Sequence, residues 1–199
     1  MKIMVIGSTG RTGKHVLTQG VQSRTRDHCL RPPARNCSPT APGWQASTRA
    51  TLTTSRPYAE PYRGQDAVIA AVGGSRIAAT LITAMHEHGV RRVVMTSSRS
   101  VPATRPRLAV SLAWLFFREA YVDLARAEGM LQVSGLDWSI ARATMLNDKP
   151  PAGRVHIDFE ANATGGAMQL SRADYATALL DTVEDPALIG KALGICGPR

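Results

Sequence analysis

The first residues whose types and spacing could do chemistry form a glycine-rich turn near the N-terminus. Gly7, Gly10 and Gly13 follow a short apolar run, Lys2–Ile6, and open a stretch of helix-compatible residues. In this spacing the first glycine allows a tight turn, the second lets the backbone approach a pyrophosphate, and the third lets the helix pack close to the strand. The free N–H groups at the helix start then bind the anion. The predicted cofactor-binding residues here are Gly7, Ser8, Thr9, Gly10, Arg11, Thr12 and Gly13.

Two later candidate strands, Asp66–Val72 and Arg91–Met95, end in small or hydroxyl-bearing residues. In a parallel sheet, ligands bind outside the carboxyl ends of the strands, so both strand ends are expected beside the glycine turn. The alternative interpretations are ordinary turn chemistry at the strand ends and a glycine turn without a ligand. On the binding interpretation, Val72, Gly73, Gly74 and Thr96 line a dinucleotide, and the hydroxyls of Ser97 and Ser98 lie near its reactive ring.

Strand-like and helix-like segments alternate along most of the chain. This alternation predicts an α/β fold with a Rossmann-like, doubly wound parallel sheet, in a single NAD(P)-binding domain over residues 1–199. His156 is expected in a further strand. The remaining predicted elements are helices at Arg11–Gly20, 77–88, Leu108–Met130 (broken at Gly129) and Ala173–Val183, and strands at Trp138–Ala141 and Ala192–Cys196.

Several classes of protein are disfavoured by composition. The sequence has no run of 18 apolar residues, so no membrane-spanning helix and no membrane partner are expected. Its start has no signal-peptide layout, and the three cysteines have no metal-ligand spacing, which predicts a cytoplasmic protein without a metal site. The cysteines are Cys29, Cys37 and Cys196.

The net charge of +9, carried by 24 Lys and Arg against 15 Asp and Glu, at first suggests a polyanion such as nucleic acid. Residues 21–60, however, contain six Arg, five Pro and almost no large aliphatic residues. A segment of this composition cannot bury enough apolar surface to offset its ordering entropy and is predicted to be irregular or disordered. Much of the charge therefore belongs to one atypical segment, and no nucleic-acid partner is expected.

Five stretches resemble the atypical short-chain dehydrogenase/reductases, a group of NAD(P)H-binding, NmrA-like proteins that includes biliverdin- and flavin-reductase-like members. The resemblance covers about residues 1–20 and 62–199. It implies a Rossmann fold, a preference for NADP over NAD, and cofactor contacts at the glycine turn, Gly73 and the Ser97 region. The stretches are KIMVIGSTGRTGKHVL, RGQDAVIAAVGG, TAMHEHGVRRVVMTSS, AYVDLARAEGMLQVSGLDWSIARATMLND and LSRADYATALLDTVEDP.

One departure from this group concerns catalysis. Its usual Tyr-x-x-x-Lys pair is missing, because Tyr121 is the candidate tyrosine and position 125 is Ala. Without a lysine to lower the tyrosine pKa, ordinary tyrosine general-acid catalysis is not supported. The predicted catalytic residues are therefore Ser97, Ser98 and Tyr121, with hydride transfer relying on positioning and on solvent or a serine hydroxyl as the proton source.

The other departure is the segment 21–60, where the group has its second and third strands and an Arg for the NADP 2′-phosphate. Members of the group read like GHEVTALVRRPE at this position. Read one base later, codons for Ser23–Arg35 can encode AGHEITAFARRPE, and read two bases later, codons for Pro42–Thr54 can encode GLAGVHAGDADDV. We hypothesise that residues of about 22–61 come from compensating frameshifts. The alternative is a genuine divergent Arg- and Pro-rich insertion.

These observations predict an NAD(P)H-binding oxidoreductase that transfers hydride to a small conjugated, quinone-, flavin- or carbonyl-type acceptor. The expected cofactor is NADP or NAD, the expected partner a small-molecule substrate, and the expected state a monomer or weak homo-oligomer. The alternatives are a non-catalytic NAD(P)-sensing regulator and a defective product of a frameshifted gene.

Two weaker signals accompany this prediction. The apolar run within 112–117 is expected to be helix core, with a roof over a flat ring substrate as the alternative. Arg99, Arg105 and Arg107 are expected in a solvated loop, with an anionic substrate as the alternative partner.

Overall fold

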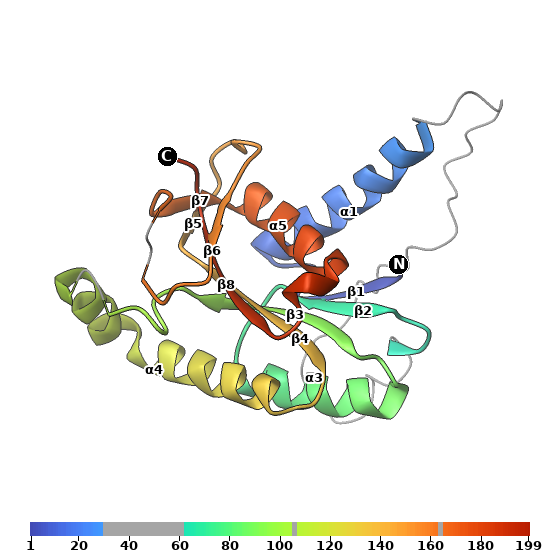
Figure 1. Ribbon diagram of the computed structural model, residues 1–199, viewed down its shortest axis with the longest axis horizontal. Helices are drawn as coiled ribbons and strands as arrows, with labels where there is room; N and C mark the ends of the chain where they lie inside the picture. Colours follow the sequence, from blue (N-terminus) through green and yellow to red (C-terminus); the bar gives the residue numbers. More distant parts are fainter. Residues whose placement is uncertain (30–61, 105–106, 163–164) are drawn as a thin grey trace.

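The computed structural model describes residues 1–29, 62–104, 107–162 and 165–199, and its centre is one six-stranded sheet (Figure 1). The strand order is β1-β2-β3-β4-β8-β6, in which the first five strands run parallel and β6 pairs antiparallel with β8. Their sequences are rich in Val, Ile and Ala, which suit strands buried on both faces. The bounds are Ile3–Ile6 for β1, Ala67–Ala70 for β2, Arg92–Ser98 for β3, Asp137–Ala143 for β4, His156–Asp158 for β6 and Lys191–Cys196 for β8.

Helices cover both faces of this sheet (Figure 1). Helices α1 (Arg11–Cys29) and α5 (Arg172–Glu184) lie on one face, and α3 (Ser75–His88) and α4 (Arg107–Gln132) lie on the other. A second, two-stranded sheet is formed by β5 (Met145–Asn147) and β7 (Gln169–Ser171), and a short 3-10 helix spans Pro186–Leu188. The predicted α/β, doubly wound, Rossmann-like fold is confirmed.

The core is divided by the sheet into two apolar clusters. On the α1/α5 side, Tyr175 and Leu179 of α5 pack against alternate residues of the strands. On the α3/α4 side, Leu81, Met85 and Leu131 pack against the other alternate residues. The period-2 alternation of the strands therefore decides which layer each side chain joins.

The predicted end of the first helix is wrong. Helix α1 continues to Cys29 instead of ending at Gly20, so residues 21–29 are helical rather than irregular. The physical reason is that neither Gly nor Pro occurs between Val21 and Arg31. The rest of the predicted irregular segment, 30–60, lies outside the described residues.

Helix α4 also differs from the prediction, because it runs through Gly129 without a break. Its interruption is at Phe117, whose φ of −121° and ψ of 20° are not helical and kink the helix there. The predicted strand of His156 is confirmed as β6, and the predicted helix over 77–88 is confirmed as α3, which ends at Gly89 in the left-handed conformation.

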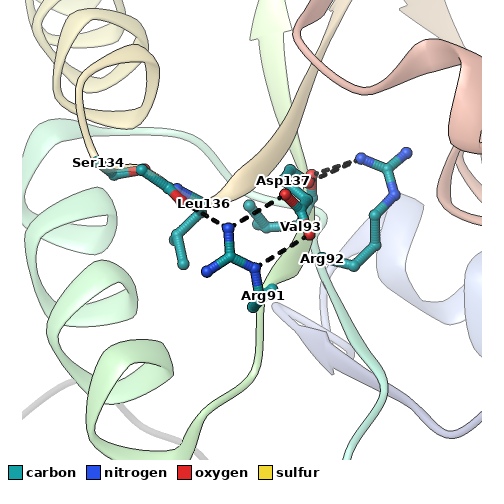
Figure 2. A network of polar contacts seen from close by, with 7 residues as sticks. Arg91, Arg92, Val93, Ser134, Leu136 and Asp137 are labelled. Carbon is teal, nitrogen blue, oxygen red and sulfur yellow. Dashed lines mark hydrogen bonds and ion pairs between the residues drawn. The ribbon is translucent and has the colours of Figure 1, made fainter.

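The amino edge of the sheet is fixed by two adjacent arginines (Figure 2). Arg92 is buried and donates to the carbonyl oxygens of Asp137 (2.9 Å) and Val183 (3.1 Å), tying β3 to β4 and α5. Arg91 lies on the other side of Asp137 and donates to its carboxylate at 3.4 Å and to the Gly135 carbonyl at 3.2 Å. The opposite, carboxyl edge carries the candidate site.

None of the helices in the described ranges combines the length and the hydropathy needed to cross a membrane.

Candidate nucleotide site

The glycine turn closes directly after β1. Gly7 has a φ of 78°, and its carbonyl accepts a hydrogen bond from the Gly10 N–H at 2.9 Å. A Cβ built on Gly13 would lie 2.2 Å from the Gly7 oxygen, so no residue with a side chain fits where α1 leaves the turn. The backbone thus meets the requirements that the spacing predicted, with a bare helix N-terminus at the carboxyl edge of the sheet.

The hydroxyl residues and the arginine of this turn divide into two groups. Ser8 and Thr12 are buried, whereas Thr9 and Arg11 are exposed. The exposed pair lies where a ligand can reach it, although Arg11 is paired with a carboxylate described below, and the buried pair supports the turn from within. Their predicted roles as cofactor contacts stay predictions.

The second predicted turn, at Val72–Gly74, lies beside the first. A Cβ built on Gly7 would lie 3.1 Å from Cγ1 of Val72. Gly73 lies against α4 and β3. A Cβ built on it would lie 2.5 Å from Cδ2 of Leu124 and 2.6 Å from the Thr96 carbonyl oxygen. The ends of β1, β2 and β3 are therefore brought together, as predicted, and glycine is required at position 73 by a close approach.

A carboxylate on α4 fixes the start of α3 at this turn. Asp123 accepts from the backbone N–H of Ser75 at 3.2 Å and from the Ser75 hydroxyl. The sequence did not single out Asp123, because a cap contributed by a residue 48 positions away has no local signal.

Arg11 is engaged by an acidic residue that the sequence analysis also missed. Its guanidinium pairs with the carboxylate of Asp148, which also accepts from Arg172 at 2.8 Å. Arg11 and Asp148 are 70% and 50% exposed, so this contact stays open to solvent and to a competing anion. The three side chains join the start of α1 to the loop after β5 and to the start of α5, and together they carry one net positive charge.

The Ser171–Asp174 stretch that marked the family resemblance is a structural anchor in the described residues. Ser171 caps α5 by accepting from the Asp174 N–H at 2.9 Å. The Asp174 carboxylate accepts from the N–H groups of Ala152 (2.8 Å) and Gly153 (2.9 Å). This motif therefore holds the loop that carries Asp148 beside the glycine turn.

The predicted catalytic serines are the last two residues of β3, and their side chains alternate across the sheet. Ser97 is 4% exposed, and within the described part of the chain its hydroxyl has no hydrogen-bond partner. Ser98 is half-buried, and its hydroxyl accepts from the Ser100 N–H at 3.3 Å. An orphaned buried hydroxyl costs stability, which marks Ser97 as the more informative of the two.

Ser97 begins a row of polar positions that crosses the sheet. Its register partners are Arg142 on β4, then Gly194 on β8, then Asp158 on β6. Arg142 makes two hydrogen bonds, 3.1 and 2.6 Å long, to the buried carboxylate of Glu128 on α4. Register alone places these residues together, and no sequence pattern predicted the row.

Arg99 fills the space above Gly194 in this row and corrects one prediction. It is 5% exposed rather than solvated, and its guanidinium donates to Asp158 at 2.5 Å and to Sγ of Cys196 at 3.3 Å. Burial raises the pKa of the Cys196 thiol, although the neighbouring Arg99 opposes that rise. Arg107 is exposed as expected but begins helix α4 instead of lying in a loop, and Arg105 lies outside the described residues.

Tyr121 is placed at the carboxyl edge but is not joined to either serine. It lies one turn before Leu124 in α4 and contacts the rings of Trp114 (5.4 Å between centroids) and Phe117 (6.0 Å). In the described ranges no hydrogen bond links Tyr121 to Ser97 or Ser98. Ala125, which replaces the family lysine, is exposed.

Exposed apolar side chains border this edge, and the sequence gave no reason to select them. Met145 and Met168 are 65% and 62% exposed, and the Met145 N–H donates to the Met168 carbonyl at 3.0 Å. Met145 is the first residue of β5, just after the end of β4, and Met168 directly precedes β7. Because Met145 is in register with Gln169, the two methionine side chains lie on opposite faces of the small sheet, and each is a separate exposed apolar group.

No group of three or more His, Cys, Asp or Glu side chains that could hold a metal ion occurs in the described residues. The expectation of no metal site stays a prediction for the whole chain.

A parallel sheet with a glycine turn at its switch from strand to helix defines the class of Rossmann-like dinucleotide-binding domains. The fit of the dinucleotide to this chain rests on the bare start of α1 and on the close packing that Gly13 and Gly73 allow, which keeps the two turns beside the strand ends. The model of the NAD(P)H-binding family matches residues 7–186, and the chain belongs to that family. The predicted family and the NAD(P) cofactor are confirmed.

Solved structures with the same fold have low sequence identity to the chain. One is ChuY, described as an anaerobillin reductase from Escherichia coli O157:H7, with 19% identity, a TM-score of 0.76, and coverage of 100% of this chain and 98% of that one. Another is the oxidoreductase ylbE from Lactococcus lactis, with 20% identity, a TM-score of 0.75, and coverage of 100% and 92%.

A third similar structure is a short-chain dehydrogenase/reductase of wide type from Veillonella parvula, in complex with NADP, with 18% identity, a TM-score of 0.74, and coverage of 99% and 94%. No curated protein matches the chain.

Proposed function

We propose that the protein is an NADPH-dependent reductase that transfers hydride to a flat, conjugated acceptor of quinone, flavin or tetrapyrrole type. The observation that carries the proposal is the glycine turn, in which Gly13 packs on Gly7 and leaves the start of α1 open to a pyrophosphate. Small carbonyl compounds remain in the acceptor range, but the exposed Met145, just after the end of β4, favours a larger apolar ring.

The preference for NADPH over NADH is supported by charge. Arg11 and Arg172 flank the single carboxylate of Asp148, so the site carries a net positive charge and suits a ligand with an additional phosphate. The NADP in the Veillonella parvula structure accords with this preference. The residue of the family that pairs with the 2′-phosphate falls at 21–60, mostly outside the described residues.

The bound nicotinamide would supply a hydride, that is, two electrons and one proton, to the acceptor. The chain's own residues then have two tasks. The ends of β1, β2 and β3 orient the two reactants, and a second proton must reach the reduced acceptor. The Ser97 hydroxyl is buried, unpartnered and at the strand end, so it is proposed to pass on that proton from water.

Binding and turnover test the proposal together. Calorimetric titration gives the dissociation constants of NADPH and NADH, and loss of NADPH absorbance reports turnover with a quinone, a flavin, a linear tetrapyrrole and a small aldehyde. We expect tighter binding of NADPH and the fastest turnover with one of the flat acceptors. Failure of both cofactors to bind would overturn the proposal.

A non-catalytic NAD(P) sensor is the second candidate. The observation that favours it is the exposed Ala125 in place of the family lysine, together with the separation of Tyr121 from both serines. Tight NADPH binding without turnover of any acceptor would establish the sensor and exclude the reductase.

For residues of about 22–61 we propose an origin in compensating frameshifts, which would make the printed chain a single domain with a replaced segment. Within the described ranges no strand pairs with the outer edge of β1, the position of the family's second and third strands. Resequencing of the gene across this segment tests the proposal. A gene sequence that encodes these residues as they stand, together with a peptide from 31–49 detected by mass spectrometry, would exclude sequencing error.

A further inference from the structure

The first part of α4 is an apolar arm that projects from the body of the protein. We define the arm as residues 107–117, which end at the kink of Phe117. In Figure 1 this yellow-green start of α4 lies at the left of the view, beyond the sheet and apart from the rest of the helix. The prediction that its apolar residues are helix core is wrong, because the kink turns them away from the sheet. The exposed side chains are Leu108 (78%), Leu112 (49%), Leu115 (73%), Phe116 (76%) and Phe117 (58%).

Such an arm is not stable alone in water. Isolated helices shorter than about 12 residues are marginal, and a helix that is apolar on most of its surface normally belongs in an interior. Trp114 ties the arm to the body by donating to the Ser100 carbonyl at 3.1 Å and by contacting the ring of Tyr121. These contacts fix one side of the arm and leave its larger apolar side without cover from any described residue.

A hollow of about 360 Å³ lies over β4 and β8 and is lined by both apolar and basic side chains. Trp138 and Ala192 in its lining pack on the cluster that lies under α3 and α4. Phe159, also in the lining, is 58% exposed. The remaining lining residues are Arg142, Gly190 and Lys191. The sheet face over β4 and β8 is therefore open at the position of this hollow.

We propose that the arm of one copy of the protein docks into the hollow of a second copy, and that the reverse contact completes a two-fold symmetric dimer. A two-fold axis requires that the same two surfaces meet twice, which one arm and one hollow on each chain satisfy. The proposal does not rest on the proposed function.

The area of the arm is sufficient for such a dimer. With about 180 Å² for a fully exposed Leu or Phe side chain, the five exposed side chains present about 600 Å². This equals the largest apolar patch expected on an ordinary monomer. If half of this area, about 300 Å², is buried on each of the two arms, and the surfaces that they contact lose the same area, the dimer buries about 1,200 Å² in total. This value reaches the lower limit for specific interfaces.

A membrane surface is the less suitable occupant. Helices that lie in a membrane interface carry a strongly basic polar face opposite their apolar face. Among the described side chains of the arm and the residue that follows it, only Arg107 and Arg118, at the two ends, are basic. An arm without a charged face suits a protein hollow.

Sedimentation equilibrium of the full chain, from about 1 µM to about 200 µM, tests the proposal. We expect the wild type to reach twice the chain mass of 21.3 kDa. Leu115→Glu in the arm and Phe159→Lys in the hollow should each weaken the dimer by about 100-fold or more. Val133→Glu is the matched control, because Val133 is 85% exposed at the other end of α4, outside the arm.

An equimolar mixture of Leu115→Glu and Phe159→Lys chains separates arm-to-hollow docking from arm-to-arm contact. One contact in the mixed dimer keeps both native surfaces, and the other sets opposite charges against each other, so the mixture should dimerise where each variant alone does not. Circular dichroism verifies that each variant folds, and Phe116→Ser replaces Leu115→Glu if that variant does not.

A monomeric wild type at all concentrations would overturn the proposal, as would dimers of Phe159→Lys alone or equal disruption by Val133→Glu. Cosedimentation of the wild type, but not of Leu115→Glu, with phosphatidylcholine–phosphatidylglycerol vesicles would assign the arm to membranes instead.

Discussion

The glycine-turn side and the acceptor side of the carboxyl edge are built by different means. On the glycine-turn side, residues 7–13 and the second turn at Gly73 meet at spacings that only glycine permits. On the acceptor side, Met145, Met168 and Tyr121 come from separate elements and are partly exposed. The first region is encoded locally and is rigid. The second is assembled over long distances and leaves apolar surface uncovered.

This difference accords with the proposal that the first region binds the cofactor and the second contacts the acceptor. A closely packed backbone turn tolerates little substitution, whereas separate exposed side chains on a short sheet can change one at a time. The substitutions below test whether the two regions respond as differently as their construction implies, beginning with the largest expected effect.

Gly13→Ala should cause the largest loss. The added Cβ would lie 2.2 Å from the Gly7 oxygen, so α1 must move away from β1. We expect the free energy of unfolding to fall by about 4 kcal/mol or more, with loss of NADPH binding. Urea denaturation and calorimetric titration measure the two effects.

The matched control for Gly13 is Gly129→Ala in α4, where nothing lies within 4 Å of the added Cβ. This variant should be more stable than the wild type by up to about 1 kcal/mol, since alanine is the better helix former. Equal tolerance of alanine at both positions would contradict the view that the glycine turn is the rigid region.

Asp158→Asn is the next largest change and probes the acceptor side. It leaves the guanidinium of Arg99, 6% exposed, without its charged partner. Breaking a buried pair in this way should lower the free energy of unfolding by about 3 kcal/mol. Asp137→Asn removes the partner of Arg91, whose side chain is 66% exposed, and a charge that acts on the buried Arg92, so it should cost less, about 1 kcal/mol in the same denaturation assay. Similar losses in the two variants would show that Arg99 is not a buried charge in solution.

The sequence predicted the features that depend on neighbouring residues and missed those that depend on distant ones, the same contrast that separates the two regions. The turn 7–13, the second turn at 72–74 and the helix ending at Gly89 depend on residues a few positions apart, so their patterns were sufficient. The end of β3 was placed too early, because residues 96–98 still pair with β4. The parallel sheet covered on both faces followed from the alternation of strands and helices. The strand order and the antiparallel β6 were not predicted.

The residues that the sequence did not predict depend on distant partners. Asp148 reaches Arg11 across 137 positions, and Arg99 reaches Asp158 across 59. The kink at Phe117 and the exposure of the arm also lacked a signal, since an apolar helix in the core and an apolar helix at an interface have the same periodicity. Tertiary register, not local pattern, determined these features.

Ser97→Ala should separate stability from activity. Removing an unpartnered buried hydroxyl is expected to raise the free energy of unfolding by about 1 kcal/mol. If Ser97 passes a proton to the acceptor, kcat should fall by about 10- to 100-fold. Denaturation and steady-state turnover measure the two changes. Ser98→Ala is the control and should alter kcat by less than about 3-fold. An unchanged kcat for Ser97→Ala would remove Ser97 from the proposed mechanism.

Tyr175 allows a pH test of the apolar cluster between α5 and the sheet, which lies beneath both regions. Burial raises the pKa of its phenol, which donates to the Ala141 carbonyl at 2.8 Å. Above about pH 10 the unfolded chain therefore loses a proton that the folded chain keeps, and the free energy of unfolding falls by about 1.4 kcal/mol per pH unit. Tyr175→Phe should be about 1 kcal/mol less stable at neutral pH and lack this part of the fall. Parallel slopes for the two proteins in urea denaturation from about pH 9 to about pH 11 would contradict the assignment.

Asp148→Asn should have the smallest effect, because it acts where the two regions touch. Asp148 comes from the acceptor side but neutralises Arg11 of the glycine turn. A diphosphate that binds at the turn must compete with this carboxylate, so its removal should tighten NADPH binding by about 3-fold at low salt. The gain should disappear at high salt, since both side chains are half or more exposed.

The matched control is Asp137→Asn, which removes a half-buried carboxylate and its Arg91 pair at the opposite edge of the sheet. Net charge changes equally in the two variants, so a difference in NADPH affinity reports position rather than total charge. If Asp148 instead holds Arg11 ready for the cofactor, its removal would weaken binding. The sign of the change therefore decides whether the acceptor side restrains the glycine turn or prepares it.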